Sequence, residues 1–143
     1  MTLQLKRGPK DRIWAPVTAR HWDDDGKTYT DEFDVRIRLA NDIDAAAAEA
    51  RKIMGLQEVE GDDAKDAVSA KEALSQYLRD NIDGFRNLID ADDNEVPWTT
   101  ENFESLIRMP PYRNALVQKV IETRVPPRDE SGNKALRGAE RKN

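Results

Sequence analysis

One acidic segment of the chain has the residue types and spacing of a calcium-binding loop. Asp90, Asp92, Asn94 and Glu101 occupy the first, third, fifth and twelfth positions of the EF-hand pattern, whose oxygen ligands surround Ca²⁺. The sixth position requires glycine for a sharp turn, but Glu95 stands there. A proline also interrupts the short strand that follows in such loops. We therefore predict an Asp- and Asn-rich turn that leads into a helix, with no metal site.

The other candidates for chemistry are isolated. His21 is the only histidine, and no serine lies in its segment to act as a nucleophile. The run from Asp23 to Asp25 is typical of a solvated turn and makes only a weak magnesium ligand set. The chain has no cysteine and no glycine-rich phosphate loop. The sequence thus yields no catalytic, cofactor-binding or metal-binding residue, and we expect a protein that is not an enzyme and needs no cofactor.

The charge of the chain is unevenly distributed. The 143 residues carry a net charge of -5. Residues 1–20 hold five basic and one acidic side chain, and residues 126–143 hold five basic and three acidic, so the segment between them carries -11. An acidic body of this kind repels nucleic acid. No apolar run is long enough for a membrane span or a signal peptide, so we expect neither a membrane nor a nucleic-acid partner.

The elements that must position these residues begin with two strands. Residues 1–12 show no periodicity and are expected to form a flexible N-terminal arm. The segment from Ile13 to Trp22 is rich in β-formers, and the segment from Phe33 to Leu39 alternates between apolar and charged residues. The Asp-Gly turn between them predicts an antiparallel hairpin, whose apolar face must pack on helices to be stable.

Helical patterns follow, each bounded by a capping residue, a glycine or a proline. The expected helices are one capped by Asn41 or Asp42, running to about Met54 and ended by Gly55; one spanning 64–82 and broken by Gly84; one capped by Thr99 or Thr100 and stopped by Pro110-Pro111; and one spanning 111–124. Between the second and third, Phe85, Leu88 and Ile89 form a short apolar segment, either extended or a helical turn.

The predicted fold class is α+β. We expect a single domain over residues 13–125, in which an N-terminal antiparallel β-hairpin packs on about four mostly amphipathic helices. Residues 126–143 are rich in proline, glycine and charge, and are expected to form a disordered basic tail.

Three blocks of this sequence together resemble the tail assembly chaperones of long-tailed bacteriophages. They are the hairpin with Phe33-Asp-Val35-Arg-Ile37, the segment from Phe85 to Trp98, and the segment from Thr100 through Pro110 to Ile121. The resemblance implies a protein without catalytic activity that keeps the long helical tape-measure protein soluble and helps to recruit tail tube subunits around it. It also implies a location in the host cell cytoplasm and absence from the mature virion.

An amphipathic helical domain with an acidic exterior is able to hold a partner helix in an apolar groove. We place this groove between the helices at 64–82 and 111–124, because their apolar stripes exceed what one hairpin covers. The candidate partner-binding residues are Leu74, Leu78, Val117 and Val120, together with Trp98. Self-association is also possible.

Two alternatives remain open at this point. One is a structural component of the virion, such as a head–tail joining or tail terminator subunit, which stays in the finished particle. The other is a small regulator or antitoxin that binds a basic protein.

Overall fold

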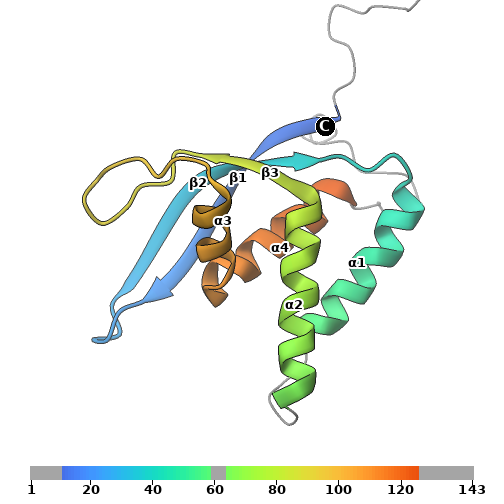
Figure 1. Cartoon of the computed structure of the whole chain (residues 1–143), viewed down its shortest axis with the longest axis horizontal. Coiled ribbons are helices and arrows are strands. Elements are labelled where there is room, and N and C mark those ends of the chain that lie inside the picture. The colour runs from blue at the N-terminus through green and yellow to red at the C-terminus, as the bar shows by residue number, and fades with distance from the viewer. Residues whose placement is uncertain (1–10, 59–63, 126–143) are drawn as a thin grey trace, which may run out of the picture.

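A computed structural model describes residues 11–58 and 64–125, so the predicted tail at 126–143 and nearly all of the predicted N-terminal arm lie outside the described residues. The described elements are, in order, β1 (Arg12–Trp22), β2 (Thr28–Arg38), α1 (Ile43–Gln57), α2 (Ala64–Asn81), β3 (Ile82–Arg86), α3 (Thr100–Ile107) and α4 (Pro110–Arg124). The three strands form one antiparallel sheet in the order β1-β2-β3, and the helices lie on one side of it (Figure 1). The predicted α+β class is confirmed.

The predicted hairpin is present and long. β1 and β2 pair in register from Arg12–Arg38 to Trp22–Thr28. The Asp23 carboxylate accepts hydrogen bonds from the backbone N–H groups of Asp25 and Lys27, both at 2.9 Å, and these bonds hold the pKa of Asp23 below its usual range. Gly26 adopts a φ of 81°, which glycine reaches without strain. The Asp-Gly reversal thus forms as the sequence indicates.

The third strand corrects the predicted end of the second helix, and it confirms the extended alternative at Phe85. The helix was expected to include Ile82 and to be broken by Gly84, but α2 ends at Asn81 and β3 begins at the next residue. Asn81 is buried, and its side-chain amide donates to the Tyr77 carbonyl at 2.9 Å. This bond uses a carbonyl of the last helical turn, and the chain then leaves directly along β2.

The helix ends follow the capping rules closely. The Asp42 side chain accepts from the Ala45 N–H, and the Thr99 hydroxyl accepts from the Asn102 N–H, so both predicted N-caps are confirmed. Gly55 does not end α1, which continues to Gln57. In the fourth helix the first residue is Pro110 rather than Pro111. Within the described ranges, no helix has both the length and the apolar character needed to cross a bilayer.

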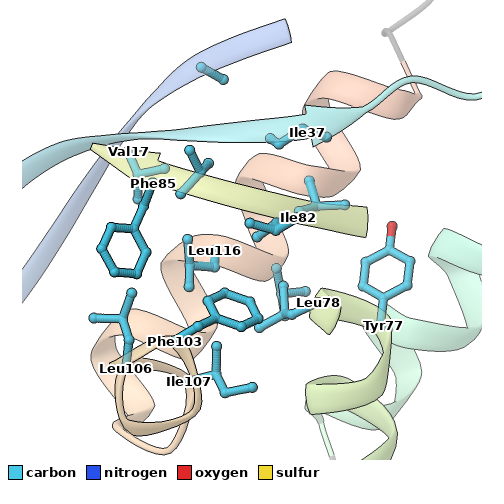
Figure 2. Packing of buried hydrophobic residues seen from close by; sticks show 14 of the residues in the cluster. Val17, Ile37, Tyr77, Leu78, Ile82, Phe85, Phe103, Leu106, Ile107 and Leu116 are labelled. Atoms are coloured by element: carbon cyan, nitrogen blue, oxygen red, sulfur yellow. The ribbon is translucent and has the colours of Figure 1, made fainter. Parts of the chain in front are cut away.

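The core lies between the sheet and the helices. The inward-facing residues of β2, Phe33, Val35 and Ile37, are at most 2% exposed, which confirms the predicted alternation. In Figure 2, Leu78 from α2, Phe103 from α3 and Leu116 from α4 converge below Ile82 and Phe85 of β3. This packing fixes the mutual positions of α2, α3 and α4, the three helices that form the surface described next.

Candidate functional site

The acidic segment folds as a turn, as predicted. Hydrogen bonds made by Asp90 hold this turn in place. Its side chain accepts from the backbone N–H groups of Asp92 and Asn94, at 2.9 and 3.0 Å, and its own backbone N–H donates to the Asn94 carbonyl. Asp93 has a φ of 65°, a conformation that Asp tolerates better than most residues. Glu101 lies apart, exposed in the first turn of α3. Among the described residues, no three Asp, Glu or His side chains converge on a common point.

His21 belongs to a cluster that ties the hairpin to α4. Its Nε2 lies 3.2 Å from the Asp31 carboxylate, and its ring stacks on Tyr29 with centroids 5.8 Å apart. Tyr112, near the start of α4, donates its hydroxyl to the same carboxylate. Burial, together with the bond to Asp31, raises the pKa of Tyr112 above its ordinary value. The imidazole thus has a carboxylate and two aromatic rings around it, an arrangement that positions α4 against the sheet.

The open face of the sheet is covered by its own side chains. Trp14 packs beneath the Arg86 guanidinium, whose central carbon lies 4.1 Å from the ring centroid. The pairing of β2 with β3 shifts at Arg36 and leaves Asp83 as a bulge residue. Asp83 accepts hydrogen bonds from Arg36, at 2.8 Å, and from Arg12. Burial opposes ionisation of Asp83, but these two arginines outweigh it and hold its pKa below the ordinary value.

Four of the five predicted partner-binding residues lie in the core. Leu74 is 4% exposed, and Leu78, Val117 and Val120 are fully buried. A partner reaches these side chains only if α2 and α4 separate. The fifth, Trp98, is 39% exposed, and its ring lies 5.1 Å from that of Phe85 and 5.0 Å from that of Phe103. Trp98 therefore combines a structural contact with an accessible edge.

A surface depression of about 300 Å³ does lie between α2 and the corner where α3 meets α4. We call it the α2–α4 groove. Seven of its nine lining residues are polar or charged, and the two apolar residues are Val68 and Ile107. The lining residues are Val68, Lys71, Glu72, Ser75 and Arg79 from α2, and Glu104, Ile107, Arg108 and Arg113 from the α3–α4 corner. Arg113 is the one lining residue that comes from α4, and none of the predicted partner-binding residues lines this depression.

Three of the lining residues form an ion-pair cluster. Arg79 donates to both carboxylate oxygens of Glu104, at 2.7 and 2.8 Å, and also to Glu72 at 2.9 Å. The bidentate bonds hold the pKa of Glu104 below its ordinary value and raise that of Arg79. This cluster connects α2 to α3 and holds these two walls of the groove together.

None of the nine groove residues is among the predicted site residues, and Val68 and Arg113 show why. Val68 is a β-branched apolar residue, a type that is usually buried, but its exposed fraction is 65%. Arg113 was not singled out, although it lies four residues before Val117 and hence on the apolar stripe of α4. A charged residue on an otherwise apolar helix face was the available signal, and Arg113 is indeed only 9% exposed.

In comparisons with known proteins, no protein-family model, no curated protein and no solved structure matches this chain.

Proposed function

We propose that this chain is a non-catalytic tail assembly chaperone of a long-tailed phage, which binds the tape-measure protein and helps to bring tail tube subunits to it. The proposal rests on one structural observation, the α2–α4 groove. It also draws on the resemblance of the hairpin and of the blocks at 85–98 and 100–121. The proposal places the protein in the host cell cytoplasm during tail assembly, and it includes the absence of the protein from the finished particle.

The groove suits a helical partner. Its two sides are helices held at a fixed separation by core residues and by the Arg79–Glu104 pair. Val68 on one side is 65% exposed, and Met109, next to the other side, is 42% exposed. A partner helix that covers these two side chains with its apolar face gains hydrophobic contact, while its flanks meet the charged rim.

The experiment is co-expression with the longest reading frame encoded downstream of this gene, followed by affinity capture of this chain. We expect stoichiometric recovery of a long helical protein that is insoluble when expressed alone. Val68→Asp should reduce recovery, whereas Met54→Asp should leave it unchanged. Met54 is the matched control because it is 41% exposed on α1, outside the groove. A partner that is soluble alone and is not captured would contradict the proposal.

The same material tests the leading alternative. A structural component of the virion remains in purified particles, whereas an assembly chaperone does not. Mass spectrometry of purified particles that detects this chain in stoichiometric amounts would therefore favour the structural role.

A further inference from the structure

Arg113 is the one charged residue that is nine-tenths buried among the described residues. It is 9% exposed, and its Nε is fully enclosed without a hydrogen-bond acceptor. Within residues 11–58 and 64–125 it forms no ion pair either. The Nε of Arg124 is also enclosed and unpaired, but Arg124 differs because its guanidinium forms an ion pair with Glu49 at 3.0 Å.

A buried guanidinium without a counter-charge is unfavourable for the folded state. Arginine does not lose its proton in proteins, so it cannot escape the desolvation penalty by becoming neutral. Buried charges are normally paired or hydrogen-bonded for this reason. The described part of the chain supplies no acceptor to Arg113. Because its Nε is enclosed, an acceptor from outside the domain has to approach the Nη atoms from the groove that Arg113 lines.

The surroundings of Arg113 favour an anion. Arg113 lines the α2–α4 groove together with Lys71 and Arg108. Neither of these cations forms an ion pair with a described residue. The two carboxylates of the groove, Glu72 and Glu104, are both engaged by Arg79. The groove thus has a surplus of positive charge on a chain whose net charge is -5.

We propose that Arg113, with Lys71 and Arg108, binds a carboxylate that enters the α2–α4 groove from an Asp or Glu side chain of the partner helix. A planar carboxylate accepts two parallel hydrogen bonds from a guanidinium, which is the geometry a single buried arginine offers best. Val68, which lines the same groove and is 65% exposed, contacts the apolar part of that helix. The identity of the partner rests on the proposed function, but the anion site does not.

The site is tested first on the isolated protein with sodium acetate as the probe, against sodium chloride at equal ionic strength. The Nε–H signal of Arg113 in ¹⁵N NMR, assigned by its loss in Arg113→Met, should shift with acetate in a saturable manner. Acetate should also raise the Tm of the wild type, and Arg113→Met should abolish this rise. Arg38→Met, which removes an exposed arginine of β2 far from the groove lining, should preserve it.

A second readout separates binding from structure. In chloride alone, Arg113→Met should have a Tm equal to or higher than that of the wild type, because it replaces an unpaired buried charge by an apolar side chain of similar length. A lower Tm for this variant together with an unmoved Nε–H signal would show that Arg113 is a structural residue, and would overturn the site. A shift with inorganic phosphate at concentrations where acetate has no effect would overturn the carboxylate assignment.

The chaperone function and the anion site at Arg113 can be contradicted independently of each other. If the tape-measure protein is captured but acetate does not shift the Arg113 signal, the chaperone function stands and the anion site is wrong. If acetate binds but no tape-measure protein is captured, the site stands and the proposed partner is wrong. If both hold, Arg113→Met should reduce capture at least as strongly as Val68→Asp does.

Discussion

Trp98 shows how a single residue fixes the angle at which the chain enters a helix, here α3. It directly precedes the N-cap Thr99, and its ring contacts Phe103, five residues further on in α3. This is the hydrophobic staple, in which the residue before the cap packs on the first turn of the helix. The sequence allowed this contact to be predicted, because the spacing between Trp98, the threonine cap and Phe103 is local. The edge-to-face contact with Phe85 joins two distant segments and could not be read from spacing.

Replacing Trp98 tests the strength of this staple. Trp98→Ala should lower the free energy of unfolding by about 1–2 kcal/mol, less than the ~3–5 kcal/mol of a fully buried aromatic residue, because the ring is partly exposed. Urea titration followed by far-UV circular dichroism measures the change. Trp22→Ala is the matched control: Trp22 is 64% exposed, so its loss should change stability by less than about 0.5 kcal/mol. Equal effects of the two variants would contradict the staple.

The Glu104–Arg79 pair makes stability depend on pH. The folded-state pKa of Glu104 lies below its ordinary value of 4.5, so its contribution is complete above that pH and is lost as the pH falls through the folded-state value. Glu104→Gln should therefore lower stability by about 1 kcal/mol at pH 7, and the difference from the wild type should shrink on acidification. Urea titrations between neutral and acidic pH measure it. The exposed Glu32, changed to Gln, should show little difference at any of these pH values.

At the scale of elements, β3 is the part of the fold that the sequence obscured. Ile82 follows Leu74 and Leu78 at helical spacing. The apolar pattern is therefore compatible with either a helix or a strand at this residue. Ile82 forms a strand because it pairs with Ile37 of β2, a residue that is distant from it in the sequence. Strands β1 and β2 were predictable because their alternation and their turn are local signals. The third strand depends on a neighbour that local patterns do not reveal.

β1 is an edge strand of 11 residues, and Pro16 lies in its middle. At the two ends of the hairpin, the Leu39 N–H donates to the Asp11 carbonyl and the Asp23 N–H donates to the Lys27 carbonyl. The backbone N–H and C=O groups of the odd-numbered residues of β1 therefore point toward β2. The backbone groups of even-numbered residues, Pro16 among them, therefore point to the open edge. Proline has no N–H there, which weakens this edge as a template for a further strand.

Removing this protection should promote self-association through the edge. Pro16→Val restores an N–H and a β-former at the centre of β1, and should increase the weight-average mass with concentration in analytical ultracentrifugation. Thr18→Val is the control, because it also places valine at an even-numbered position but leaves the number of N–H donors unchanged. If both variants associate equally, added apolar surface rather than the restored donor is responsible. If neither associates, Pro16 does not protect the edge.

At the scale of the whole molecule, the sequence predicted an apolar groove between α2 and α4, whereas the depression in the structure lies between α2 and the α3–α4 corner. The apolar stripes of α2 and α4 were correctly recognised as faces that must be covered. What covers them is the three-stranded sheet together with α1 and α3, and the extent of that cover depends on the complete packing. The groove residues follow only from the packing angle of α2 against the α3–α4 corner. Val68 and Arg113 therefore have burial opposite to what their residue types indicate: the valine is exposed and the arginine is buried.

Aspartate substitutions distinguish core from groove over the whole domain. Leu78 and Val120 are fully buried, and an unpaired carboxylate at either position costs several kcal/mol out of a total stability of about 5–15 kcal/mol. Leu78→Asp and Val120→Asp should therefore abolish the cooperative thermal transition in circular dichroism. Val68→Asp should retain a transition close to that of the wild type, because the side chain is already in water, and should lose only partner capture. A folded Leu78→Asp protein that fails to bind would instead mean that α2 and α4 separate to expose the residues first assigned to the partner surface.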